Sequence, residues 1–146
     1  MTSFADIDFA ENYFAKRVFV EKWESCQNKA GYLCTASRMI ADFCTFTDAN
    51  DDLIDYTAGN IPAPDWLQRA TCEQALYLVN LGKDPLQADK KTTLGIASTD
   101  GTVFDKSFAA DIIGINCRRI ITANGGVISA GAIANSKGIK TGRLSK

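Results

Sequence analysis

The sequence PDWLQRATCEQALYLVNLG, at residues 64–82, predicts a long helix near the middle of the chain. Pro64 suits the start of a helix, because its missing N–H would lack a partner there anyway, and Asp65 favours the positive end of the helix dipole. The apolar positions from Trp66 to Leu81 recur at helical spacing. Gly82 follows as a natural C-cap. This central helix fixes the frame into which the rest of the chain must fit.

Two more helices are expected on the N-terminal side. Ser3 and Asp6 form an N-cap pattern that predicts a first helix over about residues 4–16. An apolar stripe predicts a second helix over about residues 28–45. Residues 17–24 are expected to form a turn with Phe19 and Trp23 packed inward, and residues 46–64 an acidic surface loop.

On the C-terminal side, Asp100-Gly101 between two short apolar runs predicts a β-hairpin. A last helix is expected to start at Ser107 or Asp111 and to end near Thr122. The expected fold is therefore mainly α: a small bundle of about four helices, a short β-hairpin before the last helix, and an extended C-terminal tail. We therefore expect the chain to consist of a helical domain at residues 1–122 and a flexible basic arm at residues 123–146.

Composition limits the chemistry. The chain has 146 residues with 46% hydrophobic and 23% charged, which fits one globular domain. Histidine is absent, so the usual general base, the Ser-His and Cys-His pairs and most catalytic zinc sites are excluded. The five cysteines include no C-x-x-C pair and are expected to be buried free thiols in a reducing compartment. Cys117 comes nearest to a reactive thiol, because Arg118 and Arg119 follow it.

Several other classes are disfavoured. The acidic loop at 48–53 lacks the central Gly and the closing Glu of a calcium loop, and it is expected to be solvated. The N-terminus has no signal-peptide pattern, and no apolar run is long enough to cross a membrane. We therefore expect no enzymatic activity, no metal, no cofactor and no membrane contact.

The net charge of −1 hides an asymmetry. Residues 1–105 carry 16 acids and nine bases, a charge of −7, whereas residues 106–146 carry one acid and seven bases, a charge of +6. The segment 123–146 is rich in Gly, Ala, Ser and Asn and has no aromatic residue. It is a solubilising end, a nucleic-acid arm that acts by counterion release, or an arm that folds onto a protein partner. Arg118 and Arg119 either form ion pairs on an exposed helix face or contact a partner or DNA.

A resemblance narrows these alternatives. It rests on the run from Ile61 to Leu78, with its Ala-x-x-Glu-Gln-Ala-Leu core after prolines, and on Leu94-Gly95-Ile96-Ala97-Ser98, Gly101-Thr102-Val103 and Ser107-Phe108. In these motifs, and in its Ser3-Phe4-Ala5-Asp6 opening, the chain resembles the head–tail connector (adaptor) proteins of tailed bacteriophages. The resemblance covers about residues 3–122.

The resemblance implies a structural subunit of the phage neck. Such subunits form a homo-oligomeric ring, expected to be dodecameric, between the portal protein and the tail or its stopper or nozzle proteins. The ring continues the channel through which genomic DNA passes without sequence-specific binding. It implies no catalytic activity and a place in the virion, after assembly in the host cytoplasm.

By analogy with family members whose C-terminal extension reaches the portal or a neighbouring subunit, eight residues are expected to bind those partners. They are Arg118, Arg119, Lys137, Ile139, Lys140, Arg143, Leu144 and Lys146. The alternative is a small DNA-binding module that uses the basic C-terminal arm.

Overall fold

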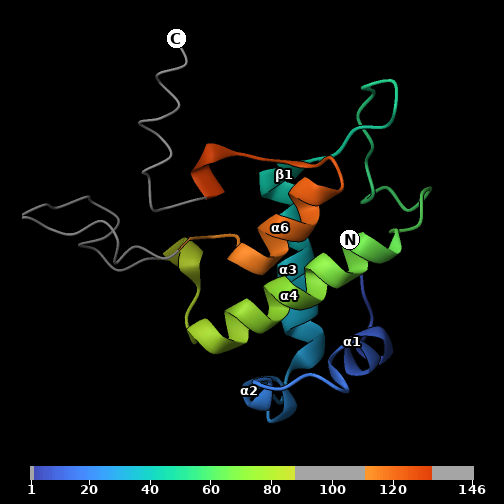
Figure 1. Cartoon of the computed structure of the whole chain (residues 1–146). Helices are drawn as coiled ribbons and strands as arrows, with labels where there is room; N and C mark the ends of the chain where they lie inside the picture. The colour runs from blue at the N-terminus through green and yellow to red at the C-terminus, as the bar shows by residue number, and fades with distance from the viewer. Residues whose placement is uncertain (1, 88–110, 133–146) are drawn as a thin grey trace, which may run out of the picture.

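A computed structural model describes residues 2–87 and 111–132. Across these residues the chain is mainly helical, as the sequence predicts (Figure 1). The α-helices are α1 (Ile7–Phe14), α2 (Glu21–Glu24), α3 (Lys29–Phe43), α4 (Asp65–Leu81) and α6 (Ile115–Ala123). Two 3-10 turns, η1 (Pro85–Gln87) and η3 (Ala130–Ala132), and two short strands, β1 (Cys44–Thr45) and β2 (Val127–Ile128), complete the described elements. The expected hairpin around Asp100-Gly101 lies outside the described residues.

Helix α4 is the centre of the fold. It packs against α3 and α6, and the shorter α1 and α2 also contact it (Figure 1). The predicted bounds of this helix are confirmed: Pro64 is its N-cap, and Gly82 ends it in the left-handed conformation at φ 74°. Every residue from 70 to 76 is buried. This middle stretch of the helix is therefore enclosed on all sides, and its three polar side chains, Thr71, Glu73 and Gln74, need partners inside the protein.

The two strands join segments that are far apart in the sequence. β1 follows α3 directly and pairs antiparallel with β2, so that Cys44 faces Ile128 and Thr45 faces Val127. The chain leaves the helix at Cys44, whose backbone is extended at φ −129° and ψ 148°. The second helix therefore ends at Phe43, and the residues expected to be its last turn form this strand.

The N-terminal region departs from expectation at the start of its first helix and at one aromatic residue. Asp6, and not Ser3, is the N-cap of α1: its carboxylate accepts the Phe9 N–H at 2.8 Å, so the helix covers Ile7–Phe14 instead of residues 4–16. Residues 21–24 form the short helix α2, and Trp23 is fully buried, as predicted. The prediction that Phe19 packs inward is wrong: its side chain is 80% exposed, and its backbone has φ 64°. Val20 and Trp23 already fill the space beneath this loop, because both are buried.

The last helix starts later than expected, at Ile115 rather than at Ser107 or Asp111. Gly114 before it is extended at φ −69° and ψ 158°. The N–H groups of Ile112 and Ile113 both donate to the carbonyl of Ala132, at 2.8 and 3.2 Å. These two residues are therefore bound to the C-terminal segment and not to a preceding helical turn.

The segment from residue 123 to residue 132 lies on the helical body, although the sequence assigns it to the arm. The Gly126 N–H donates to Ile121 at 2.9 Å, and the Ser129 N–H donates to Phe43 at 2.8 Å. Ala132 is fully buried. Backbone hydrogen bonds hold this segment on the body, and such bonds do not depend on the type of side chain. The low apolar content of the segment therefore gives no indication that it packs there. In the structure the body thus extends at least to residue 132.

Candidate assembly surfaces

Helix α6 presents one of the predicted partner-binding residues on its outer face. Ile115 and Arg119 are both exposed, and their i, i+4 spacing places them side by side. Arg118 instead forms an ion pair with Asp111, with Nη2 and Oδ2 3.3 Å apart, and both side chains are only about one-fifth exposed. Each arginine therefore fits a different one of the two interpretations. Arg118 forms an ion pair within the chain, whereas Arg119 faces outward, where a partner could reach it.

The other predicted partner-binding residues lie outside the described residues. They are Lys137, Ile139, Lys140, Arg143, Leu144 and Lys146.

Two side chains of α4 fix the segment that leads into α6. The buried Gln74 amide donates from Nε2 to the Ile112 carbonyl at 2.7 Å and accepts the Gly114 N–H at 2.9 Å. The Tyr77 hydroxyl donates to the Asp111 carbonyl. A side chain at Gly114 would come within 2.6 Å of the Tyr77 ring. The position of the α6 surface relative to the body thus depends on these contacts.

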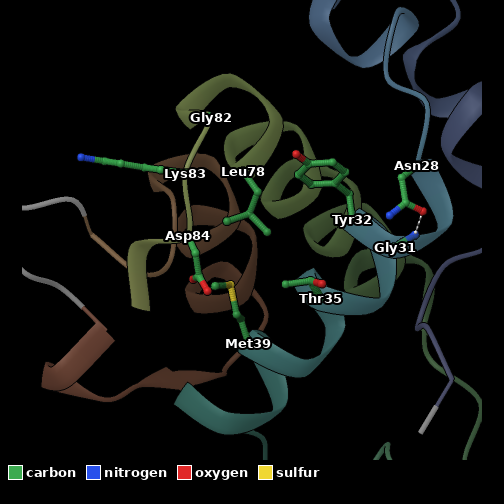
Figure 2. Close-up of a pocket in the computed structure, with 9 residues that line it drawn as sticks. All are labelled: Asn28, Gly31, Tyr32, Thr35, Met39, Leu78, Gly82, Lys83 and Asp84. Carbon is green, nitrogen blue, oxygen red and sulfur yellow. Dashed lines mark hydrogen bonds between the residues drawn. The ribbon is translucent and has the colours of Figure 1, made fainter. Parts of the chain in front are cut away.

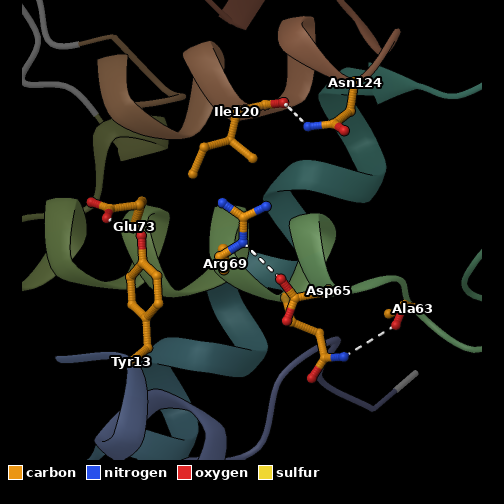
Figure 3. Close-up of polar contacts among 8 residues, drawn as sticks. Tyr13, Ala63, Asp65, Arg69, Glu73, Ile120 and Asn124 are labelled. Atoms are coloured by element: carbon orange, nitrogen blue, oxygen red, sulfur yellow. Dashed lines mark hydrogen bonds and ion pairs between the residues drawn. The ribbon is translucent and has the colours of Figure 1, made fainter. Parts of the chain in front are cut away.

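The buried carboxylate Glu73 is fully engaged. It binds the Arg17 guanidinium through both oxygens and accepts a hydrogen bond from the Tyr13 hydroxyl at 2.6 Å. Burial, together with the hydrogen bond and charge of Glu73, raises the pKa of Tyr13 to about 12. Figure 3 shows Tyr13 reaching from α1 to Glu73 on α4, and the exposed pair Arg69–Asp65 one turn away. The cluster fastens α1 and the following loop to α4, a connection that the sequence did not indicate.

The cysteines confirm the expected free thiols in part. Cys44, Cys72 and Cys117 are buried, whereas Cys34 is exposed and Cys26 is half-buried. Burial raises the pKa of Cys44 and of Cys72 to about 12, and that of Cys117 well above its usual value despite the neighbouring arginine. The Cys117 thiol therefore stays protonated at neutral pH and is a poor nucleophile.

An open cavity of about 370 Å³ lies between α3 and the end of α4 (Figure 2). Two of its polar side chains already accept hydrogen bonds from backbone N–H groups, and a third points away. Asn28 accepts the Gly31 N–H at 3.1 Å, Asp84 accepts the Leu86 N–H at 2.9 Å, and the Lys83 ammonium points away from the cavity. The hydroxyls of Tyr32 and Thr35 also line the cavity, so its lining offers neutral polar groups but directs no ammonium inward.

Two carboxylates of the acidic loop make hydrogen bonds within it, and Asp55 is one of them, since it accepts the Thr57 N–H at 2.9 Å. The Asp48 carboxylate accepts N–H groups from Asn50 and Asp52 at 2.8 and 3.0 Å, which shapes the turn. Among residues 2–87 and 111–132, no three His, Cys, Asp or Glu side chains are placed to hold a metal ion. No described helix has the length and apolarity needed to span a bilayer.

Two apolar surface features stand out in the N-terminal region. Val18 and Phe19, 70% and 80% exposed, project between α1 and α2, and we call them the knob. A cavity of about 420 Å³, which we call the recess, lies between the N-terminal segment with the start of α1 and the first turns of α3. Its lining residues are Ser3, Ala5, Asp6, Ile7, Asp8, Ala30, Leu33 and Cys34.

Comparison with known proteins adds no relative: no family model, no curated protein and no solved structure matches the chain. The function must therefore be argued from the surfaces described above.

Proposed function

We propose that the protein is a structural subunit of the neck of a tailed bacteriophage. It forms an adaptor ring, expected to be dodecameric, between portal and tail, and the ring continues the DNA channel. The observation that carries the proposal is a contiguous apolar projection left in solvent on a small body. Val18 and Phe19 are adjacent in the chain, and they are 70% and 80% exposed. Contiguous apolar surface of this kind is typical of faces that a partner covers, whereas apolar side chains exposed singly are ordinary.

The charge of the body supports passage of DNA without binding. The described residues contain 14 acidic and nine basic side chains, a net charge of −5. Asp48, Asp51, Asp52 and Asp55 are exposed in one loop. A surface of this sign repels phosphates, so a channel lined by it would let a duplex slide.

One observation favours the alternative, a small DNA-binding module. Residues 133–146 contain four basic residues, Lys137, Lys140, Arg143 and Lys146, and no acidic one. Such a segment can neutralise phosphates and release counterions. The two candidates therefore assign the same arm to different partners.

The deciding experiment mixes the purified chain with the portal protein of the phage that encodes it. We expect electron microscopy to show closed rings on the portal, and deletion of residues 133–146 or the substitution Arg119→Glu to weaken docking. A matched control is Arg69→Glu, because Arg69 lies on α4 and pairs with the exposed Asp65.

The contrary result would be absence of rings together with duplex binding by the isolated chain. For the DNA-binding module, the logarithm of the binding constant should fall linearly with the logarithm of the salt concentration, with a slope of about −0.9 per phosphate contacted.

A further inference from the structure

The knob is an apolar projection anchored at both of its ends. The residues on both sides of it are fixed to the body: Arg17 binds Glu73 through both carboxylate oxygens, and Val20 is only 2% exposed. Phe19 itself adopts the left-handed backbone conformation, at φ 64°, which an aromatic residue rarely adopts. The short loop is thus held in a conformation that points its aromatic ring into solvent, and a contact made by the ring would cost little ordering entropy.

The recess has the opposite shape and a similar chemistry. Five of its eight lining residues are Ala5, Ile7, Ala30, Leu33 and Cys34, so its surface is mainly apolar. Ile7 at its edge is 41% exposed, whereas Leu33 at its base is buried. An apolar recess of about 420 Å³ that is open to solvent suits an inserted aromatic side chain.

The charges around the two features are complementary. Lys16 and Lys22, both exposed, lie on either side of the knob in the sequence, and with the exposed Glu21 beside Lys22 they leave a net charge of +1 there. Asp6 and Asp8, both exposed, line the recess. The Asp6 carboxylate also accepts the Phe9 N–H at 2.8 Å, which holds this acid at the start of α1. Opposite charges around an apolar contact steer and orient association.

We propose that the knob of one copy of the chain inserts into the recess of a second copy. The recess includes the first turn of α1 and the knob follows its last turn, so the helix of about 12 Å separates the two features. Each copy can therefore offer its knob to one neighbour and its recess to another. A contact between different surfaces repeats from copy to copy and closes into a ring when the rotation permits. The inference rests on the proposed function in one respect: it supplies the contact between ring subunits.

Self-association of the full chain tests the inference through two variants. Phe19→Gly removes the aromatic ring and relieves the left-handed backbone, so the melting temperature should stay constant or rise. Ala30→Arg fills the recess from an exposed helical position. We expect each to weaken self-association, measured by sedimentation velocity over a range of concentrations, by at least about tenfold. The matched control is Ile61→Gly, which removes another exposed apolar side chain, 43% exposed, and should leave assembly unchanged.

A cross-link locates the contact directly. The recess contains the exposed Cys34. Val18→Cys keeps Phe19 in place and adds a thiol to the knob. Mild oxidation should then join this new thiol of one copy to Cys34 of the next, with each thiol losing a hydrogen to the added oxidant. A ladder of cross-linked species should appear with Val18→Cys and should be absent with Ile61→Cys and with Val18→Cys combined with Cys34→Ser.

Several results would overturn the inference. Unchanged association of Phe19→Gly would remove the knob from the contact. A knob-dependent species that stops at the dimer would replace the head-to-tail arrangement with reciprocal insertion. A third contrary result combines two observations: deleting residues 133–146 abolishes association, and the full-length Val18→Cys variant forms no cross-link to Cys34. That result would mean that the arm, and not the knob, occupies the recess. If Phe19→Gly still forms rings on the portal, the inference fails and the proposed function stands; if copies associate through the knob without binding the portal, the proposed function fails and the inference stands.

Discussion

Replacing Gln74 should test the contact that positions helix α6. In Gln74→Leu, the size of the side chain is nearly kept, but the Ile112 carbonyl loses its donor at 2.7 Å and the Gly114 N–H loses its acceptor at 2.9 Å. A buried polar group left without a partner costs about 1–3 kcal/mol, so two such groups cost about 2–6 kcal/mol. The apolar leucine offsets about 1–2 kcal/mol of this by its own burial. We therefore expect the free energy of unfolding to fall by about 2.5 kcal/mol, the difference between the midpoints of these two ranges, within outer bounds of about 0–5 kcal/mol.

The same helix offers a matched control. Gln68 is half-buried, and its Nε2 donates to the Ala63 carbonyl at 3.1 Å. Gln68→Leu removes one hydrogen bond at a site that water can reach, so it should cost only about 0.5–1 kcal/mol. Both variants make the same chemical change on α4, and their difference isolates the effect of full burial.

Chemical denaturation followed by circular dichroism measures both variants. The midpoint of Gln74→Leu should fall more than that of Gln68→Leu, at an unchanged slope with denaturant. Hydrogen exchange at the Gly114 amide should also become faster in the Gln74 variant. Equal costs for the two substitutions, or an unchanged Gly114 exchange rate, would refute the reasoning.

Three further predictions concern the interior. Gly114→Ala should destabilise the protein by about 1–3 kcal/mol, because its Cβ would meet the Tyr77 ring at 2.6 Å, whereas a Cβ at Gly131 would lie at an ordinary contact distance of 4.0 Å from the Ser129 hydroxyl, so Gly131→Ala should be nearly neutral by thermal melting. A thiol reagent should titrate two cysteines in the native protein, fast at Cys34 and slowly at Cys26, and all five after unfolding; a faster third thiol would contradict the burial of the others. The raised pKa of Tyr13, from 10.0 to about 12, contributes stability that is complete below pH 10 and is lost as the pH rises from 10 to 12. The free energy of unfolding of Tyr13→Phe should therefore fall less steeply between pH 10 and pH 12 than that of the unmodified chain. An equally steep fall would argue against the contact with Glu73.

Local signals in the sequence predict the central helix well. Pro64 and Gly82 act through their own backbone constraints, so the ends of α4 can be located without knowledge of the neighbours. Periodicity also locates α1 and α3, although both are shorter than expected. The burial of Gln74 cannot be foreseen in the same way, because its partners lie in a segment almost forty residues later.

Long-range pairing limits the rest of the prediction. β1 and β2 contain two residues each and join the end of α3 to the segment after α6. Neither is long enough to show a strand pattern. The same pairing draws residues 123–132 onto the body, and their small side chains give no indication of it. The sequence also leaves Arg118 open between an ion pair and a partner contact, because its bond to Asp111 spans the turn before α6.

Phe19 is predicted to be buried because it lies in a run of consecutive apolar residues, and the same run indicates the exposed knob. The run Arg17-Val18-Phe19-Val20 is too apolar for a solvated turn, which favours a place for Phe19 in the core. Val20 and Trp23, three residues apart, already supply the buried contacts of this region, so Val18 and Phe19 have no place beneath it. A run of apolar residues can be longer than one buried face can hold. The residues left over are then better interpreted as surface residues that contact a partner.

The energetics of Phe19 connect the isolated chain to an assembled one. A left-handed backbone costs about 1–2 kcal/mol for a residue other than glycine, and the exposed ring forgoes about 1.5–3 kcal/mol of burial. Glycine at this position would avoid the backbone cost without removing a core contact. The described part of the chain offers Phe19 no compensating contact, because the ring is 80% exposed. Insertion into an apolar recess of a second copy would recover the burial term and offset the strain, so the conformation that is unfavourable in the single chain becomes favourable once copies associate.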